Sequence, residues 1–184
     1  SNAATVRLSE AVGRGNVLRA ARDLGITTPL PNTPSVALGT AGVSLVELTS
    51  AYAAVVSGRY PVRARGLPTE DEEEDGFAAF FTSARGSLEP TRDRAAMLDL
   101  LWSAANTGTG RRAVLKVPTF GKTGTSQGNR DALFIGFAGN LVVGVWVGRD
   151  DDKSLGKSIS GGTVPARIWR DFMASAIAVD GTRG

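Results

Sequence analysis

The chain has 184 residues, of which 42% are hydrophobic, so it is long enough to bury one sizeable core and short for two ordinary domains. We therefore expect one compact unit, or part of a larger one. The formal net charge of +3 comes mostly from scattered arginines. Because no run of basic residues is interleaved with aromatic ones, this charge gives no indication of nucleic-acid binding.

Cysteine and histidine are both absent from the sequence. Their absence excludes disulfides, thiolate nucleophiles, triads that contain histidine, and zinc sites that depend on these ligands. Any catalysis must therefore use hydroxyl, lysine and carboxylate groups, and we predict neither a metal nor another cofactor. The longest apolar runs, 133–138 and 141–147, have the length of strands and fall far short of the roughly 20 residues of a membrane span. We expect any membrane anchor to lie outside this chain.

The N-terminal part of the chain predicts two short helices. Residues 1–3 resemble the remnant of a cleaved expression tag, so the fold prediction covers 4–184. Over 5–24 the apolar residues recur at helical spacing, with a break near Gly13 and a stop at Gly25.

A third helix is predicted after a loop rich in proline and threonine, 27–34. Ser44 begins this helix, because Glu47 stands three positions later and completes a capping box. The helix is expected to run to about Val56 and to stop at Gly58.

The middle of the chain is predicted to hold a solvated loop and a further helix. Segment 60–75 is rich in proline and arginine and ends in an acidic run, and 77–81 predicts a short strand. Thr91 is expected to cap a helix through Ala105, which ends at the flexible segment 107–110. The apolar face of that helix is predicted to comprise Ala95, Leu98, Leu101 and Trp102.

Three successive strands are predicted over 120–126, 132–138 and 141–148. The tight turn 139–140 joins the last two strands, and such short links force antiparallel pairing. An amphipathic helix over 163–177 is expected to cover one face of the sheet. Its apolar stripe is predicted to contain Val164, Ile168, Trp169, Phe172 and Met173.

The run Lys122-Thr123-Gly124-Thr125 places a cation, two hydroxyls and a residue without a side chain along a strand edge, where a carboxylate could dock. Alternation sends Lys122 and Gly124 to one face and both threonines to the other, and twist at an edge can let them converge. An alternative interpretation is that Lys122 only protects an edge strand from aggregation.

Two other ligand sites are excluded by spacing. A phosphate-binding loop needs glycine where Lys116 stands, five positions before Gly121. A calcium loop that begins at Asp150 needs glycine where Leu155 stands and glutamate where Gly161 stands. We therefore expect the aspartates after the last strand to form a solvated strand end.

Lys-Thr-Gly is a signature motif of penicillin-binding proteins and serine β-lactamases. Almost the whole chain resembles the bifunctional class A penicillin-binding proteins in the order and spacing of further segments. These segments are 37–53, 106–110, 121–125, 131–136, 144–150, 161–162 and 168–169. The resemblance implies an α+β fold, in which an antiparallel sheet is flanked by helices, as in the C-terminal half of a penicillin-binding transpeptidase or serine β-lactamase-like domain.

The resemblance also implies a function for the parent protein. It would be a serine D,D-transpeptidase that cross-links peptidoglycan stem peptides through an acyl-enzyme and is acylated by β-lactams. The expected partners are stem peptides, β-lactam antibiotics and the remainder of the transpeptidase domain, and nucleic acid is not among them. The expected location is extracytoplasmic, with a membrane anchor in the parent.

The implied catalytic residues are Lys122 and Thr125, and the implied substrate-binding residues are Thr123, Gly124 and Thr125. Lys122 would attract the substrate carboxylate, the threonines would contribute hydroxyls, and the Thr125 amide would form half of an oxyanion hole. In this family the nucleophile lies upstream in a Ser-x-x-Lys motif that a Ser-x-Asn motif follows. We find neither motif here as native sequence, and Asn2 belongs to the tag-like residues, so we expect this fragment alone to be inactive.

Two alternatives remain open. A hydrolytic relative, a D,D-carboxypeptidase or a β-lactamase, shares the Lys-Thr-Gly strand, although the Gly-Thr-Gly and Trp-Val-Gly context argues against it. A non-catalytic module that binds peptidoglycan or a protein is compatible with a fragment that lacks the nucleophile. A Ser-x-x-Lys motif upstream in the full gene would discriminate an enzyme from this non-catalytic module.

Overall fold

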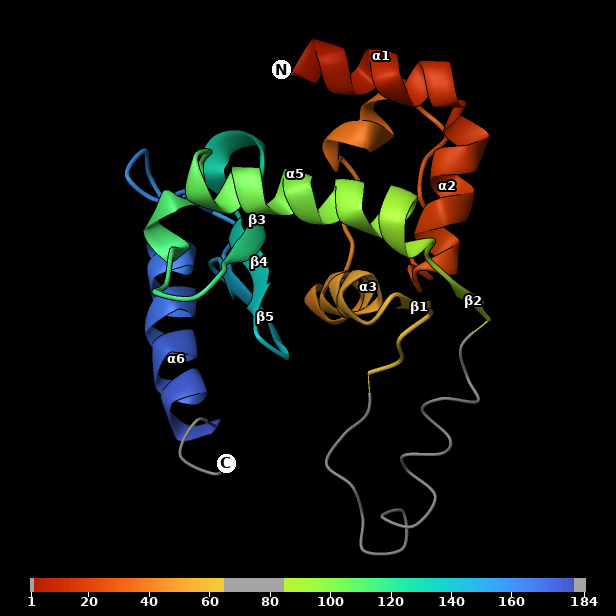
Figure 1. Cartoon of the computed structure of the whole chain (residues 1–184). Helices are drawn as coiled ribbons and strands as arrows, with labels where there is room; N and C mark the ends of the chain where they lie inside the picture. Colours follow the sequence, from red (N-terminus) through yellow and green to blue (C-terminus); the bar gives the residue numbers. More distant parts are fainter. Residues whose placement is uncertain (1, 65–84, 181–184) are drawn as a thin grey trace, which may run out of the picture. The chain divides into compact units, whose positions relative to one another are not determined.

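The computed structural model describes residues 2–64 and 85–180, which form two compact units divided between Leu88 and Glu89 (Figure 1). Composition predicted one compact unit or part of a larger one, without a division of the chain into two units. The hydrophobic core cluster around the sheet draws all its members from the second unit. In the described parts of both units, no helix is long and apolar enough to cross a membrane.

The first unit is mainly helical. Its elements are α1 (Asn2–Val12), α2 (Arg14–Asp23), the 3-10 helix η1 (Pro34–Leu38), α3 (Leu45–Ser57), and the antiparallel short strands β1 (Arg59–Tyr60) and β2 (Gly86–Ser87). The predicted break between the first two helices is confirmed at Gly13, whose φ of 91° lies in a region that favours glycine. The acidic run and the short strand predicted over 77–81 lie outside the described residues.

The predicted capping box of α3 is confirmed. Ser44 Oγ accepts a hydrogen bond from Glu47 N at 3.2 Å, and Glu47 Oε2 accepts one from Ser44 N at 3.3 Å. Gly58, with a φ of 72°, ends the helix as expected.

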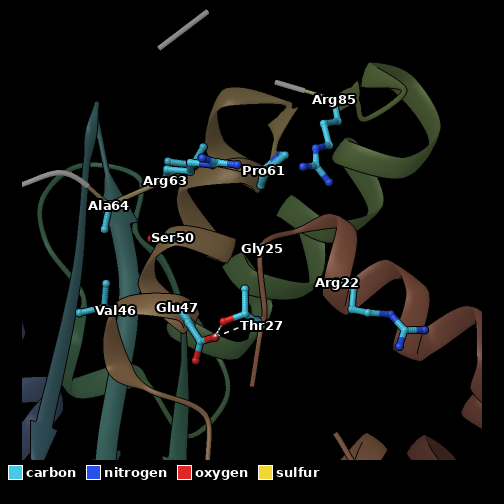
Figure 2. A pocket seen from close by; sticks show the side chains of 11 residues that line it. Arg22, Gly25, Thr27, Val46, Glu47, Ser50, Pro61, Arg63, Ala64 and Arg85 are labelled. Atoms are coloured by element: carbon cyan, nitrogen blue, oxygen red, sulfur yellow. Dashed lines mark hydrogen bonds between the residues drawn. The ribbon is translucent and has the colours of Figure 1, made fainter. Parts of the chain in front are cut away.

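The Glu47 carboxylate also holds the loop between α2 and η1 (Figure 2). Thr27 donates to Oε1 from its amide at 2.8 Å and from its hydroxyl at 2.6 Å. Thr28 donates to Oε1 from its amide at 2.9 Å and to Oε2 from its hydroxyl at 2.6 Å. These hydrogen bonds, that of the Thr27 hydroxyl foremost, hold the pKa of Glu47 far below its ordinary value. One carboxylate therefore fixes both a helix start and a neighbouring loop.

The second unit is a three-stranded sheet with helices. Its elements are the π-helical turn η3 (Pro90–Arg94), α5 (Ala95–Asn106), the 3-10 helix η4 (Arg111–Ala113), β3 (Phe120–Thr125), the 3-10 turn η5 (Gln127–Asn129), β4 (Ala132–Ala138), β5 (Leu141–Val147) and α6 (Val164–Asp180). The order β3-β4-β5 and the antiparallel pairing of both neighbours confirm the prediction for these strands.

The predicted helix cap at Thr91 is wrong. The helical segment begins one residue earlier with η3, in which Asp93 N and Arg94 N both donate to Glu89 O at 3.0 Å. The Glu89 carboxylate accepts a hydrogen bond from Arg92 N. Glu89 therefore supplies the side-chain cap, because a π-helical turn shifts the start of the segment.

The turn after α5, residues 107–110, is held against the second unit at Gly110. Gly110 is buried, and its amide donates to Ala104 O at 3.0 Å. A side chain at Gly110 would place Cβ 3.1 Å from Cε2 of Phe134. On α5 itself Leu101 is buried as predicted, whereas Trp102 is 46% exposed and does not belong to the buried face.

The core of the second unit lies between the sheet and α6. Trp169 is fully buried; its ring meets that of Phe134 edge-to-face, with centroids 5.2 Å apart, and its Nε1 donates to Val143 O at 3.0 Å. The predicted packing of this helix on the sheet is therefore confirmed. The predicted stripe is partly wrong, because Ile168 and Phe172 are 46% and 56% exposed. The fully buried stripe of α6 comprises Pro165, Ala166, Trp169 and Met173.

The core assignment is tested by two matched substitutions. Phe134→Ala is expected to lower the free energy of unfolding of the second unit by about 3 to 5 kcal/mol, because it empties the centre of the core. Phe172→Ala removes the same atoms from a largely exposed ring and is expected to cost less than about 1 kcal/mol. Urea unfolding followed by tryptophan fluorescence measures both, and equal losses would contradict the assignment.

The Glu47 network is tested by the pH dependence of stability. Because folding lowers the pKa of Glu47, its contribution is fully present above the ordinary carboxyl pKa and is lost as the pH falls toward the folded value. Glu47→Gln is expected to lower stability at neutral pH and to flatten its decline below about pH 5. The control is Glu10→Gln, which removes only an i,i+4 pair with Arg14. Thermal unfolding at a series of pH values gives the comparison, and an unchanged acid decline in Glu47→Gln would refute the network's role.

Candidate functional site

β3 is one of the two edge strands of the sheet, and the backbone N–H and C=O groups of every second residue in β3 point away from β4. Ser126 N donates to Asp131 O at 3.0 Å and continues the β3–β4 register. Because antiparallel ladders alternate between hydrogen-bonded and non-hydrogen-bonded pairs, Gly124 directs its backbone groups toward β4. The amide and carbonyl groups of Thr123 and Thr125 therefore point away from the sheet, where a ligand could meet them.

The side chains of β3 alternate between the two faces of the sheet. Thr123 lies opposite Phe134, whose ring packs against α6, so Thr123 and Thr125 lie on the α6 face. Lys122 and Gly124 lie on the other face. The exposed Lys122 reaches around the edge, and its Nζ donates to Thr123 O at 3.0 Å. The ammonium group thus meets the outward backbone at the edge, while the hydroxyls stay on the α6 face.

Both site hydroxyls have partners within the chain. Thr123 Oγ1 lies 2.6 Å from Thr109 Oγ1, and the two groups share a hydrogen bond. Thr125 Oγ1 accepts a hydrogen bond from Gly161 N at 3.1 Å. The segments after α5 and before α6 therefore fix the side chains of the edge strand.

Glycines allow these segments to lie directly on the sheet. A Cβ at Gly161 would be 2.3 Å from Leu133 O and 2.4 Å from Gly124 O. A Cβ at Gly162 would be 2.3 Å from Thr109 O. At Gly124 a Cβ would approach Cγ of Leu133 at 2.8 Å, so a side chain there is excluded by packing within the sheet as well.

The site contains residues to which the sequence assigned no role: Thr109, Arg112, Gly161 and Gly162. Arg112 Nη1 donates to Gly162 O at 3.4 Å. The glycine pair directly before a predicted helix is the signal that could have indicated a close backbone approach. No comparable signal marks Thr109, because its partner is far away in sequence.

Asp151 and Asp152, two of the three successive aspartates after β5, are paired with basic side chains. Asp151 accepts hydrogen bonds from Arg149 Nε and Nη2, both at 2.8 Å, and Lys153 Nζ lies 3.2 Å away. The Arg149 guanidinium, foremost, lowers the pKa of Asp151 to about 2. Asp152 pairs with Arg130 at 2.8 Å. This solvent-exposed network agrees with the expected strand end.

The expectation that no Ser-x-x-Lys run exists in the chain needs a correction, because Ser154-Leu155-Gly156-Lys157 matches these letters. The run follows the Lys-Thr-Gly strand instead of preceding it. Gly156 has a φ of 83°, so the run does not form a helix that would bring Ser154 and Lys157 together. Ser154 Oγ accepts a hydrogen bond from Gly156 N at 3.2 Å. We therefore do not assign it as a nucleophile.

The first unit contains a cavity of about 440 Å³ beside Glu47 (Figure 2). Arg22, Arg63 and Arg85 line it, and the oxygens of Glu47 are engaged by the loop threonines. The four lysines of the chain all lie in the second unit. This cavity therefore has no serine and lysine pair of its own, and the edge of β3 is the candidate site.

Comparisons with known proteins agree on one kind of relative, although no protein-family model matches the chain. Penicillin-binding protein 1A of Aquifex aeolicus is 35% identical over 173 residues, which are 94% of this chain and 24% of the relative. Penicillin-binding protein 1A of Neisseria gonorrhoeae is 28% identical over 185 residues, covering 96% of this chain and 23% of the relative.

The fold has a solved counterpart. The crystal structure of penicillin-binding protein 1A from Haemophilus influenzae matches 96% of this chain and 33% of that chain, with a TM-score of 0.71 and 21% identity. This likeness confirms the predicted α+β fold. The chain spans about a quarter of the length of its curated relatives. Over nearly its whole length it is homologous to one segment of penicillin-binding protein 1A, as its motifs indicated.

Proposed function

We propose that this chain forms the Lys-Thr-Gly-Thr edge of a serine D,D-transpeptidase. The parent protein would cross-link peptidoglycan stem peptides on the extracytoplasmic side of the membrane, to which it would be anchored, and β-lactams would acylate it. The observation that carries the proposal is the edge of β3, where the exposed Lys122 ammonium lies beside the outward backbone groups of Thr123 and Thr125.

The reaction would begin with a serine supplied by the remainder of the transpeptidase domain. Its oxygen attacks the carbonyl of the penultimate D-Ala of a stem peptide, and the amide bond to the terminal D-Ala breaks. The proton of the serine passes to the departing nitrogen, so that free D-Ala leaves and an acyl-enzyme forms. The amine of a neighbouring stem then attacks the ester, which restores the serine and creates the cross-link. A β-lactam follows the first step through opening of its ring.

The Thr125 amide is suited to stabilise the oxyanion of this reaction. It points outward from the edge, and a backbone donor in that position acts most strongly when charge develops on the carbonyl oxygen. Such donors contribute about 3 to 4 kcal/mol to transition-state stabilisation. The hydrogen bond from Gly161 to the Thr125 hydroxyl fixes the residue that carries this donor.

Lys122 supplies the positive charge for the substrate carboxylate. Its ammonium has three donors, and in this structure one of them is directed at Thr123 O. No carboxylate pairs with Lys122 within residues 2–64 and 85–180. Its charge is therefore available to an anionic ligand at the edge.

The role of Lys122 is tested in the full-length protein that contains this chain. Lys122→Ala is expected to slow acylation by benzylpenicillin about 10- to 100-fold, because an ammonium-to-carboxylate interaction at a partly shielded edge is lost. Thermal unfolding is expected to change little, since the side chain is exposed. The control is Lys116→Ala, an exposed lysine outside the edge strand. If the folded Lys122→Ala variant were acylated at an unaltered rate, the proposed role would be refuted. Lys122 would then only protect an edge strand from aggregation.

The isolated chain is expected not to react with penicillin, because the proposed nucleophile belongs to the remainder of the domain. Intact-mass measurement after incubation with benzylpenicillin tests this expectation. A stoichiometric adduct on any serine, including Ser154, would show that the fragment carries a nucleophile of its own. A full-length protein that is also inert would favour the non-catalytic binding module.

A further inference from the structure

The hydroxyl pair of Thr109 and Thr123 joins two segments that are 14 residues apart in sequence. Their oxygens are 2.6 Å apart, a separation typical of a short hydroxyl-to-hydroxyl bond. Thr123 belongs to the edge strand, whereas Thr109 belongs to the turn that follows α5. The contact therefore connects the candidate site to a residue that the proposed reaction does not yet use.

The backbone of Thr109 is held from both sides. Gly110, the next residue, is buried, and its amide donates to Ala104 O at 3.0 Å, which ties the turn to α5. On the other side Gly162 lies so close that a Cβ there would be 2.3 Å from Thr109 O. The hydroxyl of Thr109 is thus presented to Thr123 from a fixed position.

A hydroxyl donates one hydrogen bond and can accept two. If Thr123 donated its hydrogen to Thr109, it would have none left for a ligand. If Thr109 donates, the Thr123 hydrogen is free to point at an acceptor on the ligand, and the two bonds strengthen each other. A ligand carboxylate that lies at the edge between the Lys122 ammonium and the α6 side, where the Thr123 hydroxyl lies, would be such an acceptor and would select the second arrangement.

We propose that Thr109 is a positioning residue, which donates to Thr123 and thereby orients the Thr123 hydroxyl as a donor to the ligand carboxylate. This inference rests on the proposed function, because the carboxylate belongs to the ligand of that reaction. According to this inference, the turn after α5 contributes to recognition of the anionic end of the ligand. Thr109 itself touches neither the ligand nor the reacting atoms.

The test uses the full-length protein and two ligands, benzylpenicillin and its neutral methyl ester. Thr109→Val removes the hydroxyl and is expected to slow acylation by benzylpenicillin about 5- to 20-fold, the effect of weakening one hydrogen bond to a charged group. Acylation by the ester is expected to change less than about 2-fold, because the ester lacks the negative charge that the oriented donor favours. A merely structural role would slow both ligands alike.

Further variants complete the design. Thr109→Ser keeps the hydroxyl and is expected to restore the preference for the charged ligand. Thr107→Val is the matched control, since the Thr107 hydroxyl donates to Ser103 O at 2.9 Å and stays within the end of α5. Thr123→Val alone and together with Thr109→Val closes a double-mutant cycle, in which the second substitution is expected to add no further loss. Thr109→Ala replaces Thr109→Val if the latter does not fold.

The outcomes separate this inference from the proposed function. A wild-type protein that reacts with neither ligand overturns both. A reactive wild type in which the hydroxyl-free Thr109 variant slows both ligands equally, or neither, overturns the positioning role alone. Additive losses in the cycle also overturn it, because Thr109 would then act independently of Thr123.

Discussion

The contact between Gly161 and the backbone of the sheet is the constraint on which the geometry of the site depends. A single added carbon at Gly161 would lie 2.3 Å from Leu133 O and 2.4 Å from Gly124 O, well inside van der Waals contact. Only a residue without a side chain allows the segment before α6 to lie on the strands. Because the same residue donates to Thr125, the close approach also fixes the end of the edge strand.

The core and the site are connected through α6. Trp169 anchors this helix by its contact with the Phe134 ring and its hydrogen bond to Val143 O. Gly161 and Gly162 stand directly before the helix, so their position against β3 follows from where the helix is anchored. The interior of the second unit therefore helps to determine how this segment meets the hydroxyls of the edge strand.

The sequence allowed much of this fold to be predicted, since its signals are local. Ser44 with Glu47, the break at Gly13 and the turn between the last two strands each act within a few residues, and each element formed where expected. The order of motifs also indicated the family. The apolar stripe of α6 was partly misplaced. Periodicity identifies the apolar side of a helix, but it does not show which of the residues on that side are buried together with the large Trp169 ring.

Contacts between distant segments could not be predicted in this way. The Thr109 hydroxyl pairs with a strand residue across a turn, and no local pattern specifies that partner. The cap at Glu89 was missed because a π-helical turn shifts the start of the helical segment. Two compact units were missed because composition measures the total apolar content and not its distribution along the chain.

The outward groups of the edge strand also define a length scale. Thr123 and Thr125 are two residues apart, so their backbone groups repeat at about 6.8 Å, the distance that one dipeptide spans in an extended chain. A peptide ligand that pairs with both threonines would form main-chain hydrogen bonds at every second residue. These hydrogen bonds would not involve the side chain of the residue between. Lys122 lies beside this two-residue frame, and its charge would set which end of an asymmetric peptide enters first. The edge of β3 would then recognise the position and direction of a peptide terminus. The side chain between the two paired residues would have to be recognised by other surfaces.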